Sequence, residues 1–172
     1  MIPMYKKLGA TLIEKGQWFL QRAFHVKYTR TLTKDELVNF LAGLGLDRNR
    51  IYCSDNKYYV IDKEVMEDII VYDWTDSKKY LTDVFDCDDF ANAFKSNLGI
   101  IYNVNSVALS KYVKVTIGSR IVYHRCNLIL VTDNDVLKAF VFESQTDGWQ
   151  ELKKDEPIQI GTWKYAMGAF DF

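Results

Sequence analysis

Our fold prediction starts from the stretch Phe85-Asp86-Cys87-Asp88-Asp89-Phe90-Ala91, which places one cysteine among three carboxylates. Asp86 is a good N-cap and Asp89 stands at position N3, so we expect Cys87 to be the first residue of a helix. That helix is predicted to end at Gly99. Its buried face would carry Phe90, Ala91, Phe94 and Leu98. The helix dipole favours a thiolate at its first turn, whereas the neighbouring acids oppose one, and a bound cation would remove this conflict. The alternative is a half-buried structural cysteine whose acidic neighbours only cap the helix.

The composition predicts a folded globular chain with one well-formed core. Of 172 residues, 48% are hydrophobic, and the net charge of −1 gives no reason to expect nucleic acid or an anionic membrane as a partner. Three scattered cysteines are typical of reduced thiols in an intracellular protein. The sequence shows neither the pattern of a secretory signal nor a transmembrane segment, so we expect a cytoplasmic location.

Helices are expected in the first half of the chain and strands in the second. Thr33 to Glu36 form a capping box that opens one helix, and Asp62 caps a second helix that runs to about Val71. Residues 51–52 and 58–61 are extended or form a short hairpin. The strands are expected at 100–104, 107–109, 113–117, 120–131 and 136–143, with a last one at 158–160 or 163–165. This order predicts an α+β fold, with residues 1–30 as an N-terminal segment of no assigned role and residues 31–172 as a single domain.

A predicted hairpin supplies partners for Cys87. If Asp133-Asn134 is a two-residue loop, His124 lies directly across from Glu143 on one face of the sheet. If the sheet packs on the helix of Cys87, then thiol, imidazole and carboxylate can meet as nucleophile, base and orienting group. The alternative is an ordinary cross-strand pair between histidine and glutamate.

Cys126 stands two residues after His124 and therefore points to the same face of that strand. A zinc site made of Cys87, His124 and Cys126 is a second interpretation, although no CxxC or HxxxH spacing supports it. The other interpretation is that Cys126 is a small apolar residue that packs beneath His124. Cys53 has no assigned role.

The run Asp86-Cys87-Asp88-Asp89-Phe90-Ala91, followed by His124 and Glu143, resembles the papain-like and transglutaminase-like cysteine peptidases. Two branches are most similar: the papain-like C-terminal domain of the Marasmius-type fungal agglutinins, and the bacterial transglutaminase-like cysteine proteinases. Glu143 as the acid favours the agglutinin branch. The resemblance implies a papain-like fold, in which an N-terminal helical part with the cysteine at a helix N-terminus packs on a C-terminal antiparallel sheet.

The resemblance also implies roles for individual residues. Cys87 would be the nucleophile, His124 the general base and Glu143 the residue that orients the imidazole. Both branches depend on calcium, for which Asp86 and Asp88 are the candidate ligands. Further candidate ligands are Asp89, Asp73, Asp76 and Asp83. The backbone N–H of Cys87 is the expected first oxyanion donor, and the candidates for a second are Tyr80 and Trp74.

These implications predict a calcium-dependent cysteine peptidase or amidohydrolase that acts on a peptide or protein, or a transglutaminase-like acyltransferase with the same catalytic triad. The alternative is a catalytically inactive papain-like module that binds a partner or has a structural role. The aromatic residues that suit such a binding surface are Tyr72, Trp74, Trp149 and Trp163. An accessible, activated Cys87 would distinguish the enzyme from the binding module.

Overall fold

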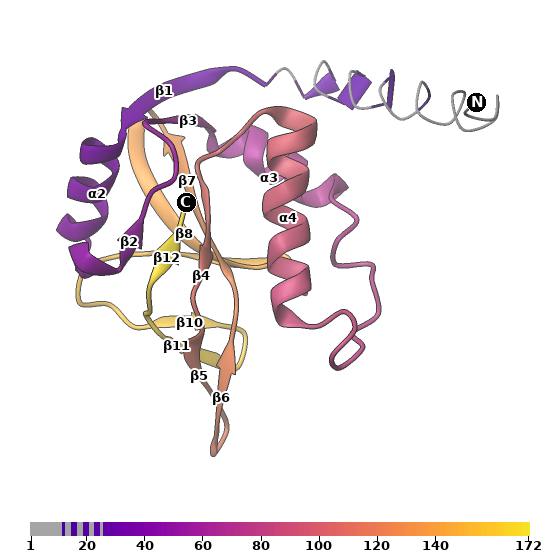
Figure 1. The fold of residues 1–172 in the computed structure, drawn as a ribbon, viewed down its shortest axis with the longest axis vertical. Coiled ribbons are helices and arrows are strands. Elements are labelled where there is room, and N and C mark those ends of the chain that lie inside the picture. The colour runs from indigo at the N-terminus through magenta and orange to yellow at the C-terminus, as the bar shows by residue number, and fades with distance from the viewer. Residues whose placement is uncertain (1–11, 13–14, 17–18, 21–22, 25) are drawn as a thin grey trace.

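The computed structural model describes residues 12, 15–16, 19–20, 23–24 and 26–172 (Figure 1). The helices are α2 (Lys34–Gly43), the 3-10 helix η1 (Arg48–Arg50), α3 (Lys63–Tyr72) and α4 (Cys87–Tyr102). The strands are β1 (Tyr28–Thr33), β2 (Ile51–Tyr52), β3 (Lys57–Asp62), β4 (Val107–Ser110), β5 (Val113–Ile117), β6 (Arg120–His124), β7 (Asn127–Asp133), β8 (Val136–Glu143), β9 (Gly148–Glu151), β10 (Ile158–Ile160), β11 (Trp163–Ala166) and β12 (Phe170–Asp171). Most of the predicted N-terminal segment, including His25, lies outside the described residues. None of the helices in the described part is long and apolar enough to cross a membrane.

An eight-stranded sheet forms the centre of the molecule. Its strand order is β1-β3-β7-β4-β12-β2, and β8 pairs with β7 on its other side and carries β9. Strand β7 is buried along almost its whole length, because it has neighbours on both edges and cover on both faces. Its alternate side chains enter two different cores: Leu128 and Leu130 enter one, and Ile129 and Val131 enter the other.

Helices cover both faces of this sheet (Figure 1). Helix α2 packs its buried residues Leu37 and Leu41 into the first core, which also contains residues of the smaller sheet. Helices α3 and α4 pack into the second core through Ile69 and Phe94, among others. The second core includes a close aromatic pair, since the rings of Phe94 and Phe142 lie 4.4 Å apart between centroids.

The smaller, four-stranded sheet has the order β10-β11-β5-β6 and is antiparallel throughout. Figure 1 shows that its hairpin β5–β6 extends away from the rest of the molecule. The chain enters this sheet after β4 and leaves it at Arg125, where β6 ends and β7 begins in the larger sheet.

Several local predictions are confirmed. Thr33 and Glu36 form the predicted capping box of α2, and Asp62 caps α3. Both alternatives for the last strand are present, as β10 and β11.

Other local predictions are wrong. Helix α4 continues through Gly99 to Tyr102, and its C-cap Asn103, with a left-handed φ of 56°, stops it, so residues 100–104 do not form the predicted strand. Strands β2 and β3 do not form a hairpin with each other, since β2 pairs with β12 and β3 pairs with β1 and β7. The predicted strand 120–131 is two strands in two different sheets.

The predicted α+β, papain-like fold is therefore corrected to a mostly β fold with curled sheets. Strands β1, β2 and β3 lie among the expected helices of the first half, and they join strands of the second half in one sheet. That sheet is mixed instead of antiparallel, because β3–β7 and β12–β2 pair in parallel. Strand β1 was not predicted because five of its six side chains are exposed, so the sequence lacks the alternating apolar pattern that indicates a strand.

Candidate functional site

Cys87 is the first residue of α4, as the sequence predicts. The side chain of Asp86 accepts a hydrogen bond from the backbone N–H of Asp88, and Asp89 accepts one from the backbone N–H of Asp86. These bonds complete the capping box and fix the first turn of the helix. Cys87 is half-buried in this turn.

His124 and Glu143 do meet, although by a different route from the predicted one. The hairpin β7–β8 turns at Asn134-Asp135, both with positive φ, so that Asp133 pairs with Val136. This register differs by two positions from the one expected for an Asp133-Asn134 loop. His124 is not part of this ladder at all, because it ends β6 in the smaller sheet.

The His124–Glu143 pair is buried between the two sheets. Nε2 of His124 lies 2.5 Å from Oε2 of Glu143, and the two side chains are 6% and 2% exposed. The hydroxyl of Tyr165 donates a hydrogen bond to the same oxygen at 2.9 Å. The other oxygen, Oε1, accepts the backbone N–H of Gln145 at 3.3 Å. The carboxylate of Glu143 is thus held by three donors.

Cys87 is the second polar partner of His124. Burial alone would lower the pKa of the His124 imidazole, but hydrogen bonds to Cys87 and Glu143, together with the charges of both groups, raise this pKa to about 9. The edge of the ring also meets Trp163, at 5.1 Å between centroids and an interplanar angle of 87°. The structure therefore brings the three predicted site residues together, with His124 in the middle.

Cys126 lies in the apolar core and is 1% exposed. Burial raises the pKa of its thiol to about 12, so the sulfur stays protonated at neutral pH. Among the described residues, the group whose ligand atoms lie close enough for one metal ion is Asp86, Cys87 and Asp88, and it includes neither His124 nor Cys126. The packing role predicted for Cys126 agrees with this burial, and the zinc interpretation has no support from the geometry.

Asp86 and Asp88 share a hydrogen bond between their side chains. This bond lowers the pKa of Asp86 and raises that of Asp88. Their ligand atoms and Sγ of Cys87 all lie within 4.8 Å of one another. Two carboxylates fit a hard divalent cation such as Ca²⁺.

The other acids named from the sequence have different surroundings. Asp73 accepts a hydrogen bond from Nδ2 of Asn97. Asp73 and Asp76 face Asp147, where burial, followed by the repulsion of these two acids, raises the pKa of Asp147 to about 7. Among the candidate oxyanion donors, Tyr80 stacks on Phe90 at 6.5 Å, and Trp74 is covered by the ammonium group of Lys78 at 4.5 Å from the ring centroid.

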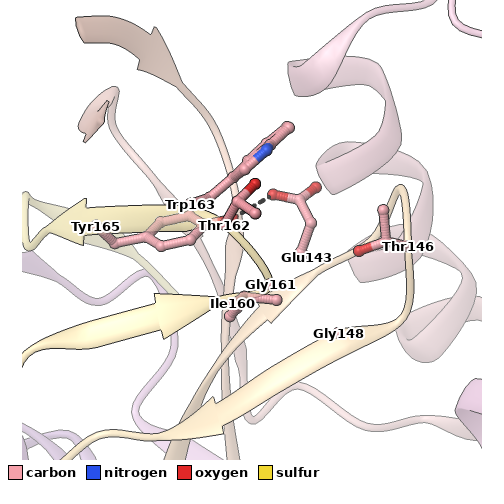
Figure 2. Close-up of a pocket in the computed structure, with 8 residues that line it drawn as sticks. All are labelled: Glu143, Thr146, Gly148, Ile160, Gly161, Thr162, Trp163 and Tyr165. Carbon is pink, nitrogen blue, oxygen red and sulfur yellow. Dashed lines mark hydrogen bonds between the residues drawn. The ribbon is translucent and has the colours of Figure 1, made fainter. Parts of the chain in front are cut away.

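A pocket of about 480 Å³ lies beside Glu143 (Figure 2). It is lined by Glu143, Thr146, Gly148, Ile160, Gly161, Thr162, Trp163 and Tyr165. Two turns form its rim, one between β8 and β9 and the other between β10 and β11. A pocket lined by Trp163 and Tyr165 was not predicted from the sequence. Their spacing of two residues does indicate that both side chains lie on the same face of β11.

The comparisons give a likeness of fold to two solved structures. The chain is similar to a solved structure of Polyporus squamosus lectin bound to the human-type influenza-binding epitope Neu5Aca2-6Galb1-4GlcNAc, with a TM-score of 0.55 and 19% identity over 80% of this chain. It is also similar to the PSL1a-E64 complex, with a TM-score of 0.56 and 20% identity over 83% of this chain. The chain spans about half the length of both, 49% and 50% respectively. No protein-family profile and no curated protein matches the sequence.

These neighbours correct the assignment made from the sequence motif. The proteins that share this fold are described as a lectin and as the PSL1a-E64 complex, and not as papain-like or transglutaminase-like peptidases. The predicted cysteine peptidase, amidohydrolase or acyltransferase is therefore wrong on this comparison, and its predicted peptide substrate is not supported. The alternative prediction, a binding module, fits the neighbours better. The short Asp-Cys-acid-Asp motif led to the error, because one helix N-terminus carries little information about the whole fold.

Proposed function

We propose that this chain is a binding module whose ligand, a saccharide or a similarly hydroxylated compound, occupies the pocket beside Glu143. The observation that carries the proposal is the composition of the pocket wall. The rings of Trp163 and Tyr165 offer apolar faces, while Thr146 and Thr162 offer hydroxyl groups. A largely apolar cavity with a few convergent polar groups is the usual form of a small-molecule site.

The lectin likeness supports the choice of ligand class to test first. The complex described for Polyporus squamosus lectin contains a sialylated trisaccharide. Because this chain spans about half of that protein, the proposal for this chain rests on its own pocket. Sugar rings carry C–H groups that pack on aromatic side chains, and hydroxyl groups that bond to threonine and to the backbone.

Titration of the ¹⁵N-labelled chain with a panel of neutral and sialylated oligosaccharides tests this proposal. We expect chemical-shift changes at the backbone amides of residues 146–148 and 160–165, with weaker binding in Thr162→Val, which removes one hydroxyl group from the rim. The matched control is Trp74→Ala, since Trp74 is half-exposed and lies outside the pocket. Saturating shifts elsewhere on the surface, or equal affinity in Thr162→Val and the parent chain, would contradict the assignment.

A second role is favoured by the contacts of His124. We propose that Cys87, His124 and Glu143 form a reactive site beside the pocket, in which Sγ of Cys87 bonds covalently to an electrophilic ligand. An imidazole whose pKa is raised to about 9 is a strong enough base to accept the proton of the thiol. Glu143 bonds to Nε2 of the ring and stabilises its protonated form.

Alkylation by iodoacetamide, followed by peptide mapping, tests this role. The thiolate displaces iodide and forms a thioether, and the proton of the thiol passes to His124. Cys53, which is also half-buried, is the internal control, because burial raises the pKa of its thiol and no imidazole is among the groups that shift it. We expect Cys87 to react first, and to lose this advantage in His124→Ala. If Cys53 reacts as fast as Cys87 in the parent chain, the reactive site is refuted.

We further propose Asp86 and Asp88 as ligands of a calcium ion at the first turn of α4. The support is the donor set: two carboxylates whose ligand atoms lie close together. Calcium would neutralise both charges next to Cys87. The remaining oxygen ligands that calcium requires would come from water and from neighbouring groups of the ligand or the chain.

A further inference from the structure

Tyr165 links the pocket to the buried His124–Glu143 pair. Its ring forms part of the pocket wall, and Figure 2 shows its hydroxyl bonded to Glu143. That hydroxyl donates at 2.9 Å to Oε2, the same oxygen that binds Nε2 of His124. Two donors from the smaller sheet thus converge on one oxygen atom from the larger sheet.

The register of the smaller sheet explains this convergence. Tyr165 pairs with Val115 on one edge of β5, and His124 pairs with Val113 on its other edge. Val113 and Val115 are two residues apart on the same strand, so all four side chains point to one face. That face is the buried one, since both valines lie in the core. The smaller sheet therefore presents an imidazole and a phenol together towards the end of β8.

The phenol is in the correct protonation state to donate. Burial, followed by the nearby charge of Glu143, raises the pKa of Tyr165 well above its usual value, so the hydroxyl keeps its proton. Of the three donors that the structure gives to Glu143, the backbone N–H of Gln145 binds the other oxygen. Without the hydroxyl, Oε2 would have His124 as its single donor, and the carboxylate could rotate towards the open pocket.

We propose that Tyr165 is a positioning residue, which fixes the Glu143 carboxylate so that His124 keeps its ring directed at Cys87. This inference rests on the proposed reactive site and extends it to a residue on a different strand. It also places the anchor of Glu143 in the pocket wall, so that a bound ligand touches the residue that holds the pair together.

Tyr165→Phe is the direct test, because it keeps the ring in the core and removes only the hydroxyl group. In a ¹⁵N-labelled sample we expect the ring Nε2–H of His124 to exchange with water about tenfold faster or more, since its acceptor is no longer fixed. We expect the alkylation of Cys87 to slow by about three- to tenfold in the same variant. The matched control is Tyr123→Phe, on the exposed face of the same sheet, for which both rates should stay the same.

A double-variant cycle separates positioning from a loss of packing. If Tyr165 acts through Glu143, Tyr165→Phe should have no further effect on alkylation in a Glu143→Gln background, because the carboxylate is already absent. Equal slowing in both backgrounds would overturn the inference. So would a variant with a lower melting temperature but unchanged Nε2–H exchange and Cys87 alkylation, since that is the signature of a purely structural role.

The ring-proton measurement requires neither a ligand nor a reactive thiol. If Cys87 is unreactive in the parent chain, the proposed reactive site fails. In that case, faster Nε2–H exchange in Tyr165→Phe would still establish that Tyr165 positions the pair, and unchanged exchange would refute it.

Discussion

Replacement of Glu143 by glutamine should convert a pH-dependent source of stability into a nearly neutral contact. In the parent chain the pKa of His124 is raised from 6.5 to about 9, by the hydrogen bonds and charges of Cys87 and Glu143 acting against burial. A histidine whose pKa is higher in the folded state stabilises the protein fully below its unfolded pKa of about 6.5. That contribution is lost as the pH rises from about 6.5 through about 9.

The magnitude follows from the same shift. A difference of about 2.5 pKa units corresponds to about 3 kcal/mol, at about 1.36 kcal/mol per unit. Glu143→Gln removes both contributions that Glu143 makes to this shift, while the desolvation of the ring remains. We therefore expect the variant to be about 2–3 kcal/mol less stable than the parent at pH 6, and within about 1 kcal/mol of it at pH 10.

Urea unfolding at pH 6 and pH 10, followed by tryptophan fluorescence, measures this difference. The control is Glu67→Gln, because Glu67 forms an ion pair with Lys63 that is open to solvent on both sides. Its loss should cost less than about 1 kcal/mol at either pH. The same destabilisation of Glu143→Gln at pH 6 and pH 10 would refute the electrostatic account, because a loss of packing alone does not depend on the charge of His124.

Three further predictions concern other parts of the chain. The pKa of Asp147 is raised to about 7, so its charge is unfavourable to the fold above that pH, although solvent screens much of the effect. The gain in stability from Asp147→Asn should therefore be about 1 kcal/mol larger at pH 8 than at pH 4. A gain that is the same at both pH values would instead indicate a backbone effect at the φ of 55° of this residue. Phe142→Ala should cost about 3–5 kcal/mol in urea unfolding, because the ring is fully buried and packs against Phe94. A loss below about 1 kcal/mol would mean that the core closes around the cavity. Asp88→Asn should weaken calcium binding in calorimetry by about tenfold or more, since one of two charged ligands is lost, and unchanged binding would place calcium elsewhere.

Helices and strands could be predicted from the sequence where interactions between residues close together in the chain determine them. Helix α4 begins at Cys87 because Asp86 and Asp89 satisfy the free backbone N–H groups of its first turn, and these residues lie next to each other in the chain. The end of the same helix was not readable. Gly99 can stop a helix, but α4 continues to Tyr102 with Asn103 as its C-cap, because the packing of Leu98 and Tyr102 into the core extends the helix by another turn.

The geometry of the candidate site was harder to predict from the sequence. The prediction that His124 and Glu143 are partners is confirmed by their 2.5 Å contact, but the cross-strand ladder that predicted it does not exist. In the observed register Asn127 pairs with Phe142, so one further step would place Cys126, and not His124, opposite Glu143. The ladder ends at that step, because the backbone of Cys126 bonds to Ser110 instead.

What brings His124 to Glu143 is the change of sheet at Arg125. A sequence pattern reports which residues alternate along one strand, and it treats 120–131 as continuous because apolar residues recur on both sides of the break. The break itself follows from distant pairings: Val113 holds His124 in the smaller sheet, and Leu109 holds Asn127 in the larger one. The same change of sheet gives Tyr165 its place beside His124. A substitution that joined β6 and β7 into one strand would therefore separate His124 from Glu143, even though every residue of the site remained in the sequence.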